Sequence, residues 1–198
     1  MRLFGRRETR SWEAASKDIA TASLDLRNEF YQRCIEALDW NIGRRIIRPP
    51  QSRRTLSGYA ELSIIALQIL TAGAASIEHG YIDVKNEEMF LIDLGPRLCG
   101  GNNETAPEVV IYEAVRFREL QSNPELLSIR VASQIASHLY RENNTEADRR
   151  LAAMLFAKLV PSFYLRLQVT VARAFGDDKT ARQIERSIKE IRAAGRGY

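Results

Sequence analysis

The longest uncharged stretch of the chain, residues 62–77, predicts a helix at the centre of the fold. Its polar side chains are two serines, one glutamine and one threonine. Sixteen residues at 1.5 Å per residue span roughly 24 Å, which is less than the ~30 Å hydrocarbon core of a bilayer. Glu61 and Glu78 flank the stretch, and charged side chains are costly inside a membrane. The pattern favours a buried central helix, with a membrane-embedded helix as the alternative.

A long amphipathic helix is predicted before this stretch. Ser11 has the side chain of an N-cap, and apolar residues then recur every three or four positions from Trp12 onward. The apolar stripe closes near Leu38 or Trp40, so these side chains are expected in the core. Gly43 weakens the helix, and Pro49-Pro50 ends it because proline cannot donate a backbone hydrogen bond.

The second half of the chain also reads as helices with clear starts and stops. A capping box at 105–108 predicts a helix to about Leu120, and Asn123-Pro124 opens the next one, to Tyr140 or Arg141. A further cap at 145–148 starts a helix that Pro161 kinks or divides. The continuation ends near Phe175, and Gly176 separates it from a last helix, 178–194.

The segment between these halves is ambiguous. Tyr81–Val84 and Met89–Leu94 can form a small β-hairpin across the turn 85–88, and a helix over 86–94 is the competing interpretation. A loop is expected through Gly95, Pro96 and Gly100-Gly101. The chain as a whole predicts an all-α protein of six or seven helices around a buried central helix, with or without that hairpin. A flexible basic arm, 1–10, precedes a single helical domain, 11–198.

The amino-acid composition adds little to the fold prediction, but it limits the possible roles of the cysteines and the expected compartment. Hydrophobic content of 45% and charged content of 27% are ordinary for a globular protein. Cys34 and Cys99 are far apart and match no metal-ligand or CxxC spacing, so each is expected to be a free thiol in a reducing compartment. The start of the chain has no pattern of a secretory signal. We therefore expect a cytoplasmic protein, which can be peripheral at a membrane.

Charge is strongly segregated along the chain. Residues 1–58 carry a net charge of +5, residues 59–125 carry −7, and residues 126–198 carry +6. The densest cationic segment is a linker, 43–54, with five arginines around Pro49-Pro50. Within one molecule these charges can neutralise each other. Between molecules, the same segregation favours head-to-tail contact or an anionic ligand on a basic face.

Arginine-rich segments at both ends and in the linker are the candidate binding sites. The guanidinium group is a planar fork of donors that matches phosphate, and several such contacts make binding salt-dependent. The linker contains no aromatic residue, so base stacking has weak support there. We expect the arginines of both ends to gather on one exterior surface. The candidate residues are Arg6, Arg7, Arg44, Arg45, Arg48, Arg53, Arg54, Arg186 and Arg192.

No catalytic motif accompanies them. The two histidines, His79 and His138, have no metal-ligand partner at a recognised spacing. Glu29 and Glu36 lie two turns apart on one predicted helix, where a solvated face is the simpler explanation. Nucleotide-binding glycine motifs are missing from the sequence. The sequence thus predicts no enzyme, no cofactor, no bound metal and no small-molecule substrate.

These observations favour a non-enzymatic helical assembly protein. It would form homo-oligomers and bind nucleic acid or an anionic membrane surface through its arginines, like a matrix or nucleocapsid component in physical character. The alternative is a soluble helical adaptor that binds another protein and uses the arginines only for solubility.

Overall fold

A computed structural model describes residues 11–50, 56, 58–100, 107–120, 122–140, 146–191 and 193. Within these residues the secondary structure is helical, which confirms the all-α prediction. The helices are α1 (Trp12–Gly43), α2 (Gly58–Glu78), α3 (Glu87–Cys99), α4 (Pro107–Leu120), α5 (Pro124–Leu139), α6 (Glu146–Ala157), α7 (Val160–Ala174) and α8 (Asp178–Ile191). A short 3-10 turn, η1 (Val84–Asn86), precedes α3.

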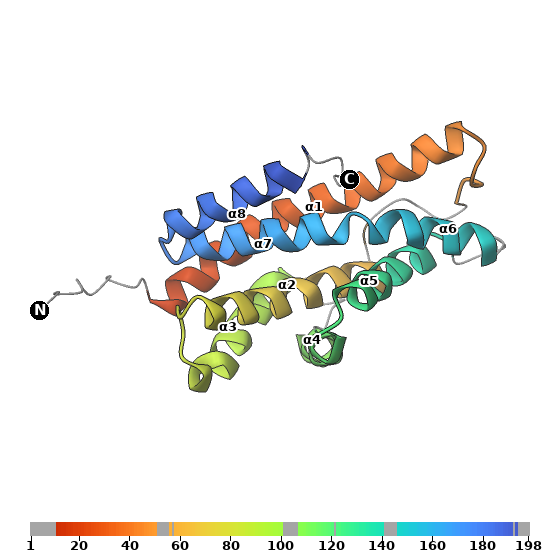
Figure 1. Ribbon diagram of the computed structural model, residues 1–198. Helices are drawn as coiled ribbons and strands as arrows, with labels where there is room; N and C mark the ends of the chain where they lie inside the picture. The colour runs from red at the N-terminus through yellow and green to blue at the C-terminus, as the bar shows by residue number, and fades with distance from the viewer. Residues whose placement is uncertain are drawn as a thin grey trace, which may run out of the picture.

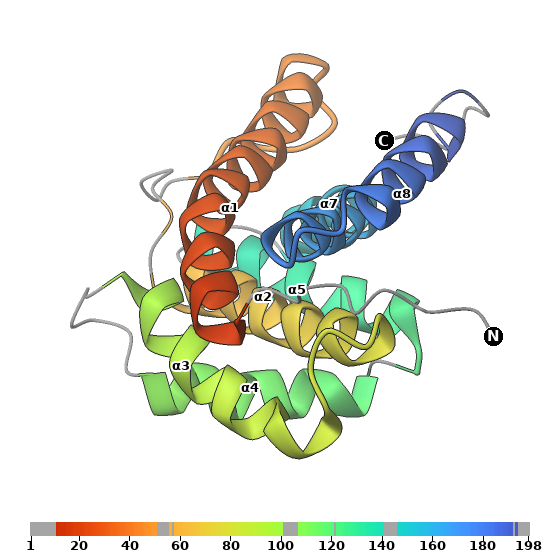
Figure 2. The ribbon, with the colours of Figure 1, turned by 90° about the vertical axis from the view of Figure 1, so that its left-hand side faces the viewer.

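The uncharged stretch forms α2, and the other helices are arranged around it. α2 contacts α1, α3, α4, α5 and α7. Figures 1 and 2 show it between α1, α7 and α8 on one side and α3 and α4 on the opposite side. Ile64, Leu67 and Ile69 are at most 1% exposed. By length and composition alone, Ala60–Glu78 could cross a membrane, but 78% of its most apolar part is buried inside the protein, as in a core helix.

Two of the predicted helix starts, at Ser11 and Asn123, are confirmed, whereas Thr105 and Thr145 of the other two predicted caps lie outside the described residues. The Ser11 side chain accepts a hydrogen bond from the Ala14 backbone N–H, and the Asn123 side chain accepts one from Leu126. Pro161 lies in the first turn of α7 and so separates α7 from α6. Gly176 has a positive φ of 74°, which a glycine adopts without steric cost, at the turn between α7 and α8.

The predicted hairpin at 81–94 is wrong, and the competing helix is present and longer than expected. α3 continues through Gly95 and Pro96 to Cys99, so the loop predicted there is also wrong. Phe90, Leu94 and Leu98, spaced one turn apart, are at most 3% exposed. Burial of this stripe against α1 and α2 outweighs the low helix propensity of glycine and proline. Pro96 lies on the exposed side of the last turn.

A buried arginine joins the first three helices. Arg27 is only 4% exposed, and its Nη1 lies 3.2 Å from the Leu98 carbonyl oxygen and 3.4 Å from Glu61 Oε1. Burial lowers the pKa of Arg27, and the Glu61 carboxylate opposes that shift. Glu61 at the start of α2 is therefore the counter-ion of a core arginine.

Candidate anion-binding surfaces

The end of α1 turns sharply and exposes three of the predicted arginines. The Arg44 and Arg45 backbone N–H groups donate to the carbonyls of Trp40 and Ile42. Arg45 then takes a positive φ of 60°, in the left-handed region. That conformation is uncommon for a residue with a side chain and costs about 1–2 kcal/mol. The turn points Arg44, Arg45 and Arg48 into solvent at one end of the molecule.

A buried side chain and two backbone hydrogen bonds hold this turn against the rest of the protein, and the guanidinium groups take no part. Ile47 is 4% exposed and packs into the core, whereas Ile46 remains 51% exposed. The Arg48 N–H donates to Asp148 Oδ1 at 3.2 Å. The Tyr140 hydroxyl donates to the Arg48 carbonyl oxygen at 2.7 Å. The arginine side chains are thereby left available for a partner.

An exposed tryptophan lies beside these arginines. Trp40 is 67% exposed, so the prediction that its side chain belongs to the core is wrong. The guanidinium carbon of Arg44 lies 5.9 Å from the centre of the Trp40 ring, a cation–π contact. Among the described residues, no carboxylate lies within ion-pair distance of Arg44, Arg45 or Arg48. We call Trp40, Arg44, Arg45, Ile46 and Arg48 the α1 tip.

A second cationic surface runs along α8. This helix packs on α7 through Ala181, Ile184 and Ile188. Its solvent side carries Lys179, Arg182, Arg186 and Lys189, all exposed. No described carboxylate lies within ion-pair distance of these four side chains. We call them the α8 cationic face.

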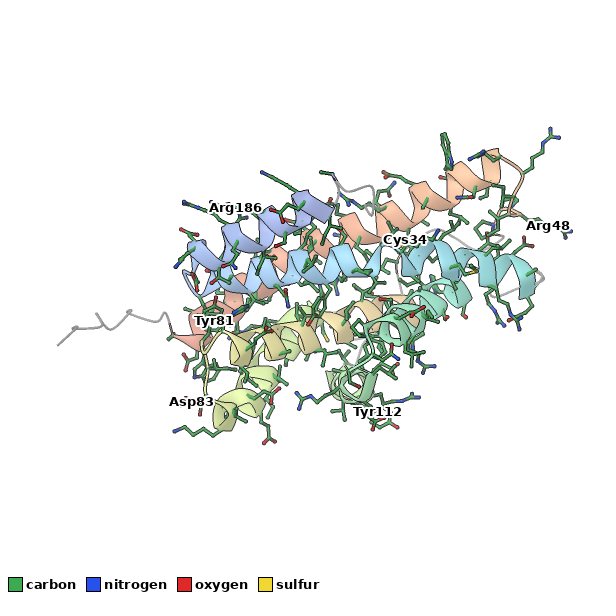
Figure 3. The ribbon with its side chains drawn as sticks, viewed as in Figure 1. Cys34, Arg48, Tyr81, Asp83, Tyr112 and Arg186 are labelled. Atoms are coloured by element: carbon green, nitrogen blue, oxygen red, sulfur yellow. The ribbon has the colours of Figure 1, made fainter. Side chains whose placement is uncertain are left out.

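The predicted arginines that the structure describes do not gather on one surface. Figure 3 labels Arg48 at one end of the molecule and Arg186 on α8, well separated from it. The described linker arginines therefore do not share a surface with Arg186, and the expectation for the arginines of both ends stays a prediction, because Arg6 and Arg7 lie outside the described residues. The physical reason for the separation is that α1 is 32 residues long, about 48 Å, and carries its C-terminal end beyond the end of α8. Arg6, Arg7, Arg53, Arg54 and Arg192 lie outside the described residues.

A groove that the sequence did not reveal lies between α1, α7 and α8. α1 and α8 diverge above α7, as Figure 2 shows, and the groove between them has a volume of about 400 Å³. Leu26, Val169 and Ile188 form its apolar lining. Its cationic lining consists of Arg33 from α1, Arg166 and Arg173 from α7, and Lys189 from α8.

Two glutamates hold the groove arginines in place. Glu29 binds Arg166 at 2.6 Å and Arg33 at 3.0 Å through separate carboxylate oxygens, and Glu185 binds Arg173 at 2.6 Å. The hydrogen bond from Arg166 is the main reason that the pKa of Glu29 lies below its usual value. Glu29 thus has a structural partner rather than the simple solvated position predicted for it.

The cysteines and His79, which could in principle act in catalysis or bind a metal, have structural surroundings. Cys34 and Cys99 form no disulfide bond in the described structure and are both buried, and burial raises the pKa of the Cys34 thiol. The His79 ring stacks at a tilt against Tyr81, with 5.5 Å between ring centres. In the part of the chain that the structure describes, no three His, Cys, Asp or Glu side chains are grouped so as to hold a metal ion.

Comparisons with known proteins give no relative for this chain. No family model, no curated protein sequence and no solved structure matches it. Function must therefore be inferred from the surfaces themselves.

Proposed function

We propose that this is a non-enzymatic helical protein that attaches to an anionic membrane surface through the α1 tip and associates with copies of itself. The observation that carries the proposal is the exposed pair Trp40 and Ile46 among three arginines whose guanidinium groups have no carboxylate partner in the described structure.

The chemistry of the tip fits the boundary between lipid and water. Tryptophan concentrates at that boundary because its ring is apolar and its indole N–H can still be hydrated. Arginine forms forked hydrogen bonds with phosphate, and anionic lipids attract each nearby cation by about 1 kcal/mol. Trp40 and Ile46 would enter the interface while Arg44, Arg45 and Arg48 meet the headgroups.

The shape of the tip favours a membrane over nucleic acid. The tip ends the longest helix and lies at an extremity of the molecule (Figure 1), where it can insert into a planar surface. A single-stranded nucleic acid also stacks on aromatic rings, but it needs no exposed isoleucine beside the ring. Ile46 is 51% exposed, and transfer of its apolar side chain out of water lowers the free energy.

Tryptophan fluorescence tests this half of the proposal directly. The chain has two tryptophans, Trp12 and Trp40, so a Trp12→Phe variant reports on the tip alone. Vesicles with phosphatidylserine should shift its emission to shorter wavelength, and vesicles of phosphatidylcholine alone should not. The shift should weaken as salt rises, because the attraction is screened.

A matched pair of triple variants locates the binding surface. The first variant replaces Arg44, Arg45 and Arg48 with Ser and should reduce vesicle binding at least about tenfold. The second replaces Lys179, Arg182 and Arg186 with Ser and should have a smaller effect. Equal vesicle binding by the tip variant and the native protein would reject the membrane site and favour the adaptor hypothesis. A change in Trp40 emission with single-stranded RNA but not with vesicles would favour nucleic acid instead.

Self-association is supported by an apolar surface on the side opposite α8. Val84, Met89 and Ile92 of η1 and α3 are 69%, 58% and 51% exposed. Met89 and Ile92 are three residues apart and therefore share one face of α3, and exposed apolar side chains that share a face are typical of contact surfaces between proteins. Figures 1 and 2 place α3 away from both cationic surfaces, so copies can pack there while the α1 tip stays accessible.

Light scattering after size-exclusion chromatography tests the second half. The native protein should increase in mass with concentration, and a Met89→Asp/Ile92→Asp variant should stay at monomer mass. Met154→Asp, at a side chain that is 63% exposed on α6, is the control and should behave like the native protein. A native protein that is monomeric at every concentration would remove self-association and leave the tip proposal standing.

A further inference from the structure

We infer that the groove between α1, α7 and α8 binds a compact ligand that carries two or more phosphate groups. This inference goes beyond the proposed membrane attachment and does not depend on the α1 tip. It rests on the convergence of Arg33, Arg166, Arg173 and Lys189 from three helices onto one hollow of about 400 Å³.

The charge balance of the groove leaves it positive. Glu29 neutralises one of the two arginines that share it, and Glu185 neutralises Arg173. One arginine charge and the Lys189 charge therefore remain without a counter-ion among the described residues. Cations crowded in this way repel each other, and an anion that enters between them relieves that repulsion.

Arg33 and Arg166 are also held in position before any ligand binds. Arg166 and Arg33 each use one terminal nitrogen on Glu29, which leaves further N–H groups of each guanidinium for a ligand. Both side chains also border the stacked rings of Phe30 and Phe163, whose centres are 4.4 Å apart. Their side-chain entropy is thus partly lost on folding rather than on binding, which favours affinity.

The form of the groove selects the class of ligand. The four cations and Glu185 line one hollow, whereas phosphates of an extended polymer would be matched by a row of charges such as Lys179, Arg182 and Arg186 along α8. None of the described side chains that line the groove is aromatic, so they offer no stacking platform for a base. A small polyphosphate or a multiply phosphorylated polyol fits both observations. Such a group can be a free solute or the headgroup of a lipid.

Calorimetric titration of the full chain with sodium tripolyphosphate tests the inference. We expect binding in the micromolar to millimolar range and a rise in melting temperature on saturation. Lys189→Gln and Arg166→Gln should each weaken the affinity at least about tenfold, since each removes a charged contact. Lys189 is exposed and has no partner in the described structure, so its variant should fold normally, as far-UV circular dichroism would verify.

Lys85→Gln is the matched control, because Lys85 is an exposed cation, 77% accessible, that lies in η1 and is not among the residues that line the groove. Its variant should bind tripolyphosphate as the native protein does. Soluble inositol hexakisphosphate and vesicles with phosphatidylinositol bisphosphate then separate the two sources of the phosphates. Binding of the soluble compound alone supports a free solute, and binding of both supports a headgroup.

Three results would overturn the inference. One is no heat and no thermal shift at millimolar tripolyphosphate. Another is equal weakening by Lys85→Gln and Lys189→Gln, which would mean general attraction to a basic protein. The third is loss of tripolyphosphate binding in the Arg44, Arg45 and Arg48 triple variant but not in Arg166→Gln. That third result would leave the α1 tip as an anion site and remove the groove.

Discussion

Arg45 occupies a backbone position where an arginine is costly. Its φ of 60° suits glycine or asparagine better than a residue with a long side chain. A residue held against local preference is often found where function requires it. At Arg45 the α1 tip gains an exposed cation beside Trp40 and Ile46.

The expected effect of Arg45→Asn separates stability from binding. Asparagine tolerates the left-handed conformation, so the variant should gain up to about 1 kcal/mol of unfolding free energy. The same variant should bind phosphatidylserine vesicles more weakly, because one cation is lost. Urea denaturation and vesicle co-sedimentation measure the two effects. A variant that is both less stable and unchanged in binding would contradict this account of the residue.

At the scale of the elements, Glu29 links α1 to α7. It accepts from Arg33 one turn along its own helix and from Arg166 across the groove. The arginines lower the pKa of Glu29 below its value in the unfolded chain. A carboxylate of this kind stabilises the folded state above its unfolded pKa of about 4.3, and the contribution is lost as the pH falls through the folded pKa.

The Glu29→Gln variant should therefore be less stable than the native protein at pH 7, by no more than about 1 kcal/mol because the pair is partly exposed. The difference should shrink below about pH 4 and disappear in stronger acid, where the native carboxylate is also neutral. Urea denaturation midpoints from pH 7 to pH 3 measure it. Glu36→Gln is the control on the same helix, at an exposed side chain with no partner in the described structure, and should show little difference at any pH.

At the scale of the whole molecule, α2 makes the helices one unit. One continuous core includes residues from α1 through α7, and α2 lies at its centre. Most of α8 is attached through a smaller cluster on α7. A fold built in this way is expected to unfold in a single step, because no group of helices has a separate core of comparable size.

Leu67→Ala should lower the free energy of unfolding by about 2–5 kcal/mol, since Leu67 is fully buried in α2. Far-UV circular dichroism and tryptophan fluorescence should report the same midpoint before and after the change. Leu24→Ala, at a side chain that is 48% exposed, is the control and should cost less than about 1 kcal/mol. Two separate transitions would show that the chain contains more than one folding unit.

The sequence was informative where the relevant residues are neighbours along the chain. The Ser11 and Asn123 caps, the division at Pro161 and the turn at Gly176 depend on one or two turns of backbone, and each is as predicted. In α3 the same local reasoning gave too much weight to Gly95 and Pro96. The spacing of Phe90, Leu94 and Leu98 contained the correct helical signal.

The sequence by itself therefore determined the all-α class, the buried α2 and the arginine-rich end of α1, because hydrophobic period, caps and charge runs are local properties. Only the tertiary structure decided that Arg27 is buried on Glu61, that Trp40 is exposed, and that Arg33 and Arg166 share Glu29. Arg166 and Glu29 are 137 residues apart, and their contact follows from how α1 and α7 cross. Helix crossings depend on the whole core, so no local pattern specifies which charges they bring together.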